Sequence, residues 1–403
     1  MDDTIPMPLE PRAPAPTPVS RPFDAAEPMH HTLPIEFSGS GSEYFRIWVV
    51  NLLLTLVTLG LYYPWAKVRR LRYFYGNTTV GGHPLDFHGD PKRMLRGFLL
   101  VGAMVLLYSV AGKVSPLAGL IAFVIVAAIW PALLRASLQF RLANTSWRGL
   151  RFRFCGDLPG AYRAMLPLFI PGAISLLGVL VEQGAPRLGG GVASLAGLVA
   201  LALFPLFFWM LKKYQHDHYA LGQLQTELRT GPGPFYLLAL KTAGVAIAAA
   251  LLVGAVAAVV GGLGAMALVF GGAGGRASPA AIVAMVLLFL MVYAAVILVV
   301  YPYLSARLQN LVWGRTRSQL VQFDSTLGFW PLLRLTLKNW LLVLLTLGLY
   351  LPFARVATAR LRLEAISVQM LLSPDELVST LRERADDASG DAAGDLFGFD
   401  IGL

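Results

Sequence analysis

Long apolar segments alternate with short basic ones along the chain. Six of the apolar segments approach or exceed the roughly 17–25 residues that a helix needs to cross a bilayer. They occupy residues 97–113, 116–134, 165–182, 192–211, 235–262 and 280–304. Short links join these segments in three pairs, and long basic connections separate the pairs. The pattern therefore predicts a polytopic membrane protein built from repeated helix pairs.

Two further apolar segments, Leu52–Trp65 and Trp340–Phe353, are too short to cross a bilayer comfortably. Both contain Thr-Leu-Gly-Leu-Tyr and reach a proline two residues later. We expect two short interfacial or re-entrant helices in the cytoplasmic leaflet. Gly60 and Gly348 would end each dip, and the proline would begin the next helix. The alternative is that both segments cross, giving eight spans instead of six.

An internal repeat underlies this alternation, because five apolar segments run into a proline and then into a basic, aromatic-rich stretch. The repeat prolines are Pro64, Pro131, Pro205, Pro302 and Pro352. Asn77 and Asn144 follow the first two prolines by thirteen residues, each before a threonine. We expect both asparagines to cap a helix or turn the chain.

Hairpin-like pieces follow the basic stretches. Thr78–Val80 and Leu85–Phe87 flank a Gly-Gly pair, and Thr145–Trp147 and Leu150–Phe154 flank Arg-Gly. Unpaired strands cannot lie in lipid, so we expect these pieces to form small cytoplasmic β-hairpins, with strands of successive repeats pairing in a small sheet. The predicted fold class is an all-α polytopic membrane protein with small cytoplasmic β-hairpins between the helix pairs.

The composition agrees with a membrane protein. Hydrophobic residues make up 56% of the 403 residues and charged residues 14%, with a mean hydropathy of +0.62. Soluble domains carry about 25% charged residues, so this composition excludes an ordinary soluble protein. The positions of lysine and arginine set the orientation. The long connections at 64–96, 131–165, 211–241 and 303–340 hold seven, six, four and five of them, and each short link holds one. Positive-inside statistics place the long connections in the cytoplasm.

Two acidic tails flank this basic body. Residues 1–44 carry two arginines against seven acids, and residues 373–403 carry two against eight, although the whole chain has a net charge of +10. Prolines crowd residues 1–34, which predicts a disordered tail. We therefore expect a disordered tail at 1–34, a repeat-built membrane domain at 35–372 and a mostly disordered acidic tail at 373–403. Within the last tail, Ser-Pro-Asp-Glu at 373–376 predicts the start of a short helix.

The basic and aromatic residues after the repeat prolines are the candidate site. They combine positive charge, which anionic head groups attract, with aromatic rings that anchor at a membrane interface. The candidates for binding a lipid or an acidic partner are Trp65, Lys67, Arg69, Arg70, Arg72, Tyr73, Arg135, Arg141, Arg355 and Arg360. The more ordinary interpretation is that these residues fix topology and anchor the helices.

Other chemistry has little support in the sequence. His216 and His218 are two residues apart but lack a third placed ligand, so no metal site is predicted. No motif indicates a cofactor or a catalytic triad, and we expect a protein that is not an enzyme. Membrane lipids explain the basic charge better than nucleic acid, which is not an expected partner. The alternating pattern of Asp395–Leu403 suits strand addition to a protein partner through the acidic C-terminal tail.

The residues after Phe37 resemble the YjgN family, bacterial inner-membrane proteins built around a domain of unknown function. The resemblance is carried by Gly-Ser-Glu-Tyr-Phe at 41–45, Thr-Leu-Gly-Leu-Tyr-Tyr-Pro-Trp-Ala at 58–66, Asn-Thr at 77–78 and Phe-His-Gly at 87–89. It covers about residues 35–370 and implies a multi-pass protein of the bacterial inner membrane. No catalytic residue follows from the resemblance.

The sequence leaves two functions open. The first is a non-enzymatic membrane protein whose basic cytoplasmic face engages anionic lipid or an acidic partner. The second is a transporter or channel for a small solute, since repeated helix pairs can enclose a central cavity. The six spans hold almost no ionisable residue away from their ends, which weighs against coupled transport of ions.

Overall fold

The computed structural model describes residues 31–182, 186–270 and 279–383 and is mostly helical. Within these ranges, six helices are long and apolar enough to cross a membrane. They lie at Pro91–Val114, Leu117–Ala143, Leu158–Gly178, Gly189–His216, Gly233–Val256 and Phe289–Trp313. Each of the six predicted spans thus coincides with a candidate membrane-spanning helix. The alternating tail segment 395–403 lies outside the described residues.

The chain folds as five successive strand–helix–helix–strand units. The first comprises β1 (His31–Phe37), α1 (Gly41–Val57), α2 (Tyr63–Gly76) and β2 (Thr78–Val80), and the second β3 (His83–Phe87), α3 (Pro91–Val114), α4 (Pro116–Ala143) and β4 (Thr145–Trp147). The third comprises β5 (Leu150–Phe154), α5 (Leu158–Glu182), α6 (Pro186–His216) and β6 (Tyr219–Leu221). The fourth comprises β7 (Leu224–Gln225), β8 (Glu227–Leu228), α7 (Gly233–Phe270), α8 (Pro279–Trp313) and β9 (Thr316–Arg317), and the fifth β10 (Val321–Ser325), α9 (Phe329–Leu345), α10 (Leu351–Leu363) and β11 (Ile366–Met370).

The strands of all five units form one sheet that closes on itself. Their order is β7-β6-β5-β4-β3-β2-β1-β11-β10-β9-β8, with antiparallel pairing at each step for which a register is defined. The two ends of this order, β7 and β8, are separated in the chain by Thr226 alone. The segment Leu224–Leu228 therefore pairs with β6 through its first half and with β9 through its second half. The result is a ring of strands in which β7 and β8, each paired on one side only, are joined through the chain itself.

Hydrophobic side chains from around the ring meet in one core. Trp147, Leu224, Val321 and Val368 are buried there, and half-buried residues from β1, β2, β3 and β5 pack against them. Side chains of a strand point alternately to its two faces, so one face of every unit lines the interior of the ring. The β-hairpins predicted between the helix pairs are present. As expected, strands of successive repeats pair with one another, but in the described part of the chain they form one sheet of eleven strands, so the all-α fold class and the small size of the sheet were wrong.

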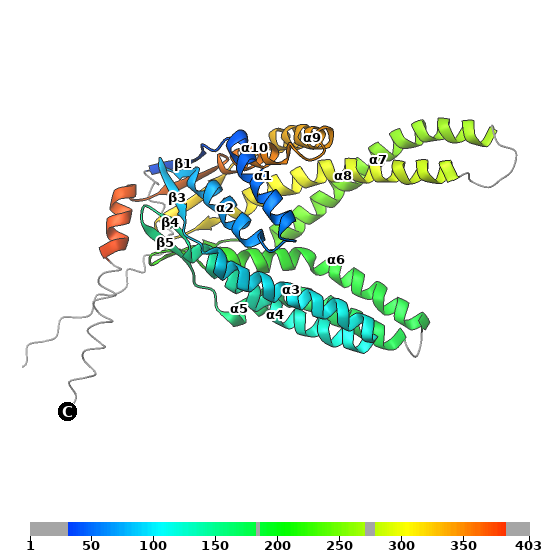
Figure 1. Ribbon diagram of the computed structural model, residues 1–403, viewed down its shortest axis with the longest axis horizontal. Helices are drawn as coiled ribbons and strands as arrows, with labels where there is room; N and C mark the ends of the chain where they lie inside the picture. Colours follow the sequence, from blue (N-terminus) through cyan, green and yellow to red (C-terminus); the bar gives the residue numbers. More distant parts are fainter. Residues whose placement is uncertain (1–30, 183–185, 271–278, 384–403) are drawn as a thin grey trace, which may run out of the picture.

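The helices form a second ring at one end of the strand ring. The second helix of each unit packs against the first helix of the next, and α10 packs against α1 to close the circle. In Figure 1 the strands gather at one end of the molecule, and the long hairpins α3–α4, α5–α6 and α7–α8 extend away from them. The pairs α1–α2 and α9–α10 remain close to the sheet. Units one and five are neighbours, so one sector of the ring has only short helices.

The two short pairs are tight hairpins. α1 ends at Val57 and α2 begins at Tyr63, and the turn between them holds Leu59 and Gly60 at positive φ angles. α9 and α10 repeat this geometry with Leu347 and Gly348. As expected, a glycine lies in each turn and Pro64 and Pro352 begin the following helix. A helix of 17 residues is about 25 Å long, less than the roughly 30 Å of a bilayer core.

The same repeat proline has a different place in the long hairpins. Pro131, Pro205 and Pro302 lie inside the continuous helices α4, α6 and α8. A proline inside a helix removes one backbone hydrogen bond and favours a bend there. In the long hairpins the second helix therefore begins before the repeat proline and continues through it, whereas α2 and α10 begin at the proline.

The ends of the predicted membrane domain differ slightly from the structure. β1 begins at His31, four residues inside the tail predicted at 1–34. The short helix predicted from Ser373 is present at 374–383, and its first turn carries a capping box. The backbone nitrogen and hydroxyl of Ser373 donate to Glu376 Oε2 at 2.9 and 2.8 Å. The rest of the two predicted tails lies outside the described ranges.

Candidate anion-binding chamber

A cavity of about 410 Å³ lies inside the strand ring. A barrel of eight strands is just wide enough for its own side chains or one small ligand, so a ring of more strands leaves space at its centre. Apolar side chains from successive units form most of the wall. The apolar lining comprises Ile35, Val80, Leu85, Leu142, Trp147, Phe152, Ala220, Leu221, Leu224, Trp313, Val321, Phe323, Val368, Met370 and Leu377. We call this space the chamber.

The helix side of the chamber is polar. Arg141, at the end of α4, contributes the only charge among the described residues that line the chamber. Tyr75 and Tyr219 lie in the same lining, and Tyr75 has an electrostatic effect on Tyr219. Burial raises the pKa of Tyr219 above its usual value, against the opposing effect of the Arg141 guanidinium. The phenol therefore stays protonated at neutral pH and can donate a hydrogen bond.

Two further cations lie on other helices, and one of them, Lys212, interacts electrostatically with Arg141. Lys212 of α6 lies within electrostatic range of Arg141 and of Arg362 of α10. Lys212 Nζ donates to Gln215 Oε1 at 3.1 Å, and Arg362 Nε donates to Gln309 Oε1 at 2.9 Å. Both partners are neutral amides. We call Arg141, Lys212 and Arg362 the cation cluster, and none of the three forms an ion pair with a described residue.

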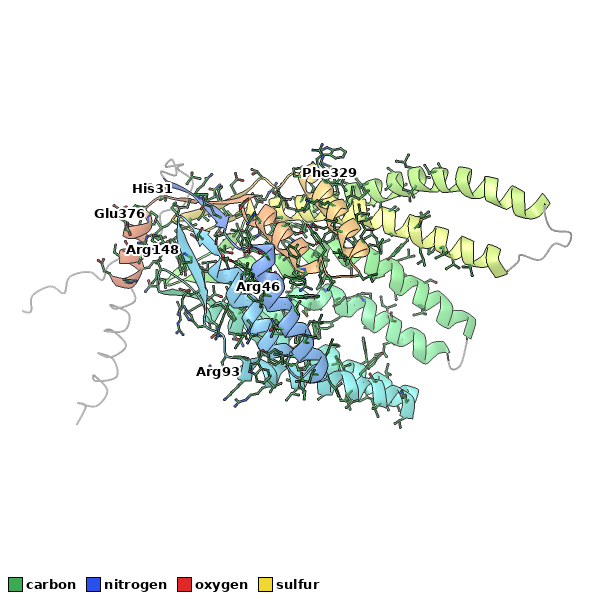
Figure 2. All side chains as sticks on the ribbon, turned by 45° about the horizontal axis from the view of Figure 1, so that its top comes forward. His31, Arg46, Arg93, Arg148, Phe329 and Glu376 are labelled. Carbon is green, nitrogen blue, oxygen red and sulfur yellow. The ribbon has the colours of Figure 1, made fainter. Side chains whose placement is uncertain are left out.

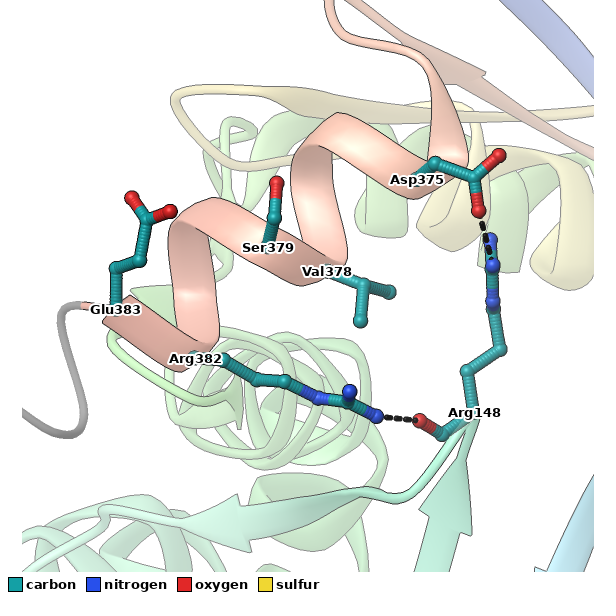
Figure 3. Close-up of a pocket in the computed structure, with 6 residues that line it drawn as sticks. All are labelled: Arg148, Asp375, Val378, Ser379, Arg382 and Glu383. Carbon is teal, nitrogen blue, oxygen red and sulfur yellow. Dashed lines mark hydrogen bonds and ion pairs between the residues drawn. The ribbon is translucent and has the colours of Figure 1, made fainter.

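The helix at 374–383 covers the other end of the chamber, where the β-hairpins turn. Leu377 and Leu381 are almost fully buried, and Leu377 lines the chamber. At the rim, Arg148 forms an ion pair with Asp375, and an Arg382 nitrogen donates to the carbonyl oxygen of Arg148 at 3.0 Å (Figure 3). Arg148 holds the pKa of Asp375 below its usual value, mainly through its hydrogen bond to the carboxylate. We call residues 374–383 the lid helix.

The start of the chain also lies at this end. Figure 2 places His31 beside the lid helix that carries Glu376, with Arg148 close by. The charge of His31 acts on Glu376, in agreement with this view. β1 and the lid helix therefore meet where the first and last units are joined.

Three of the sequence-predicted arginines hold neighbouring units together. Arg72 donates to the Gly89 carbonyl at 3.3 Å, Arg135 to Gly156 at 2.8 Å and Arg360 to Gly39 at 2.8 Å. Each acceptor lies in the turn between the first strand and first helix of the next unit. Trp209 and Asn310 make the corresponding bonds, to Thr230 at 2.8 Å and Leu327 at 3.0 Å. Every junction in the ring therefore has one such bond.

The candidates on α2 have mixed surroundings. Trp65 stacks on Tyr62, with ring centroids 6.0 Å apart. The Tyr73 hydroxyl accepts from the Ser40 nitrogen and donates to the Ser40 oxygen, both at 2.8 Å, and burial raises its pKa above the usual value. Arg69 approaches Asn51 Oδ1 at 3.5 Å. Lys67 and Arg70 are half-buried. Lys67, Arg70 and the exposed Arg355 form no ion pair with a described residue.

Other sequence candidates have structural partners. Asn77 and Asn144 end α2 and α4, and their side-chain nitrogens donate to Tyr73 and Phe140 carbonyls at 2.8 and 2.7 Å, which confirms their capping role. His216 Nδ1 lies 2.9 Å from the Thr316 hydroxyl, whereas His218 Nδ1 lies 2.8 Å from the Tyr214 oxygen. The two histidines thus serve separate contacts. Among the described residues, no three His, Cys, Asp or Glu side chains gather as metal ligands.

Sequence reasoning selected Arg141 but missed Lys212, Arg362 and the chamber itself. The repeat carried a usable signal. Arg141 and Arg362 both stand ten residues after their repeat proline, and Lys212 stands seven after its own. Positions at this spacing share one helix face, so a ring of units would point them to a common centre.

Comparison with known proteins places the chain among bacterial proteins. A family model described as "Bacterial protein of unknown function (DUF898)" matches residues 32–396. The inner membrane protein YjgN of Salmonella typhimurium is 31% identical over 177 residues, which cover 43% of this chain and 45% of that protein. The inner membrane protein YjgN of Escherichia coli K12 is 31% identical over 137 residues, 34% of each chain. The matched part therefore spans less than half the length of these curated relatives. No solved structure shows a significant match.

Proposed function

Because this chain belongs to DUF898, a family of bacterial proteins of unknown function, we propose its role from the ring: it binds an anionic lipid at the cation cluster and catalyses no reaction. The chain is a multi-pass protein of the inner membrane, by its six candidate spans and the names of its relatives. Lipid is therefore the most abundant ligand within reach.

The observation that carries this function is the meeting of three unpaired cations. Arg141, Lys212 and Arg362 come from three different helices and have no acidic partner among the described residues. Like charges repel, and the half-buried Lys212 and Arg362 lose hydration that their neutral amide partners restore only in part, whereas Arg141 is exposed. A bound anion offsets both costs. Phosphate and carboxylate head groups suit arginine especially well, because a guanidinium can donate two parallel hydrogen bonds.

The short hairpins supply a route to this cluster. Leu59 and Leu347, at the two hairpin tips, are 94% and 95% exposed, as suits side chains that dip into the hydrocarbon of one leaflet. Arg355 lies two helical turns before Arg362 on the same face of α10, about 10 Å away. With the basic connections in the cytoplasm, as the positive-inside rule favours, the hairpins lie in the inner leaflet. A head group of that leaflet can then approach between the short hairpins.

Lipid occupancy of the purified protein tests this role. Wild type and the R141Q, K212Q and R362Q variants are exposed to equal amounts of phosphatidylglycerol and phosphatidylethanolamine, and bound lipid is counted by native mass spectrometry. We expect wild type to prefer phosphatidylglycerol and each variant to lose most of that preference. R93Q is the matched control, because it removes an exposed charge at the start of α3, and Arg93 neither lines the chamber nor acts electrostatically on Lys212. Equal occupancy in all five proteins would contradict anion binding at the cluster.

A transporter or channel for a small solute is the second candidate, and the chamber at the centre of the ring supports it. Transport further requires a path from the chamber through the helix ring. Solute flux into proteoliposomes, compared between wild type and a variant with the chamber filled, separates this function from lipid binding.

A further inference from the structure

Resting on the proposed function, we infer that the chamber holds the hydrocarbon chain of a single-chain anionic amphiphile, whose head group is bound by Arg141. The ligand class is a long acyl or alkyl chain with one carboxylate or phosphate. A free fatty acid and a lysophospholipid share this chemistry.

The volume of the chamber indicates a ligand that fills it. Protein interiors have few voids larger than one water molecule, whereas this chamber measures about 410 Å³. Such a volume falls near the lower end of the roughly 300–1,000 Å³ of small-molecule sites. It suits one hydrocarbon chain better than the two chains of a phospholipid.

The lining indicates the same class of ligand. Aliphatic and aromatic residues of all five units form the wall, and Val80, Leu85, Phe152 and Leu221 are only half-buried because the chamber lies beside them. Water in such a space has few hydrogen-bonding partners, so an apolar ligand is favoured over a hydrated one.

The lining residues whose polar groups have no hydrogen-bond partner among the described residues lie at one end, whereas the hydroxyls of Thr226, Thr316 and Ser318 in the same lining are already bonded to backbone carbonyls. Arg141, Tyr75 and Tyr219 line the chamber on the helix side. The side chains of these three residues form no hydrogen bond with a described residue, so their N–H and O–H groups are available to a head group. Lys212, which does not line the chamber, adds positive charge within electrostatic range of Arg141 and of Arg362. The opposite end is closed by Leu377 of the lid helix, which faces the tail of the ligand.

The lid helix supplies a second entrance. Its ion pair with Arg148 is made by the exposed Asp375, and its apolar contact consists of Leu377, Val378 and Leu381. The helix follows β11 by only a few residues and can swing away without unpairing the ring. A soluble amphiphile can enter here, whereas a membrane lipid approaches from the short hairpins.

Binding to protein in nanodiscs of zwitterionic lipid tests the inference. The probes are hexadecanoate, lysophosphatidylglycerol with the same chain, hexadecanol without a charge and butanoate without a chain. We expect one hexadecanoate or lysophospholipid per protein, and at least tenfold weaker binding of hexadecanol and butanoate. The tighter of the first two identifies the head group. Equal binding of hexadecanol and hexadecanoate would overturn the inference.

Two variants separate the chain site from the head-group site. L221W fills the chamber and leaves the cation cluster intact, and H83W places the same side chain on an exposed strand position as its control. We expect L221W to weaken hexadecanoate binding at least tenfold while phosphatidylglycerol occupancy persists. If R141Q abolishes hexadecanoate binding but L221W does not, the anion site stands and the chain lies elsewhere. If neither variant matters, both the anion site and the chamber site are wrong.

Binding of fatty acids of increasing chain length to the wild-type protein tests the chamber site even if a variant fails to fold. Affinity should rise by up to about fourfold per methylene group, the value for full burial, and then stop rising once the chamber is full. Affinity that keeps rising with every added methylene would indicate partition into the bilayer and would contradict a closed site.

Discussion

The guanidinium of Arg360 in α10 donates a hydrogen bond of 2.8 Å to the carbonyl oxygen of Gly39, 321 residues earlier in the chain. The same kind of bond joins Arg72 to Gly89 within the first half of the molecule. The last unit is therefore attached to the first as the internal units are attached to one another. Together with the pairing of β1 and β11, this contact turns a row of five units into a ring.

Closure of the ring can be tested by a disulfide. Thr32 of β1 pairs with Gln369 of β11. A T32C/Q369C variant, in a C155S background that removes the native thiol, should form an intramolecular disulfide under mild oxidation, because paired strands lie about 4.8 Å apart. Faster migration on non-reducing gels reports the bond.

The control for this disulfide uses the next strand. Gln322 of β10 pairs with Gln369 from the other side, so T32C/Q322C places the thiols two strands apart, at about 10 Å. That distance exceeds the reach of a disulfide. Cross-linking of T32C/Q322C in preference to T32C/Q369C would contradict the register of the seam.

A methyl group at Gly89 should destabilise the protein. The ring of Phe87 folds back over this glycine, and a Cβ at position 89 would overlap Phe87 Cε1. G89A must displace the buried ring, at a cost of about 1–3 kcal/mol of unfolding free energy. A lower thermal midpoint of the detergent-purified protein reports this. G97A in α3 is the control, since its added methyl meets open space, and an equal loss in both variants would argue against the Phe87 contact.

Docking of the lid helix should weaken in acid. Arg148 lowers the pKa of Asp375, so the ionised carboxylate contributes to docking above its usual pKa of about 3.9. This contribution to docking is lost as the pH falls through the lowered pKa of Asp375. A spin label at S379C in the C155S background should therefore become more mobile below about pH 4.

The D375N variant gives the matched measurement. It should already raise the mobility of the label at pH 7, because the ion pair with Arg148 is missing. D86N, which removes an exposed acid from β3, should not. A label that is equally immobile in wild type and D375N at every pH would show that the apolar face alone holds the lid.

The chemistry of the bilayer explains why so much of the helical layer could be predicted. A span must be long and apolar, so hydrophobic length found all six, and the paired Gly60 and Gly348 with the prolines located the short hairpins. Turn residues such as Gly81-Gly82 likewise marked the hairpins. These features depend on residues that are close to one another in the sequence.

Non-local contacts account for what could not be predicted. Nothing near His31 indicates that its partner is Met370, and a single repeat does not reveal that five copies return to the start. Arg72 and Arg141 carry the same charge in similar surroundings, yet one bonds a neighbouring turn and the other lines the chamber. Their places in the repeat differ, eight and ten residues after the proline, but the meaning of that difference follows only from how each helix is rotated within the ring.

The membrane position of the short hairpins can be tested with single cysteines in the C155S background. L59C and L347C should resist membrane-impermeant thiol reagents from either side, because both tips lie in lipid under the proposed topology. S115C, between α3 and α4, should react from the periplasm and H83C from the cytoplasm. Reaction of L59C or L347C from the periplasm would show that the short hairpins cross.

The seam between β1 and β11 also constrains how the protein is made. The ribosome delivers the first strand more than 300 residues before its partner, so β1 must wait through the insertion of all three long hairpins. Contacts so distant in sequence close slowly, and an unpaired strand is open to pairing with other chains in the meantime. A chain cut short during translation would leave two open edges, and only completion of the fifth unit removes both.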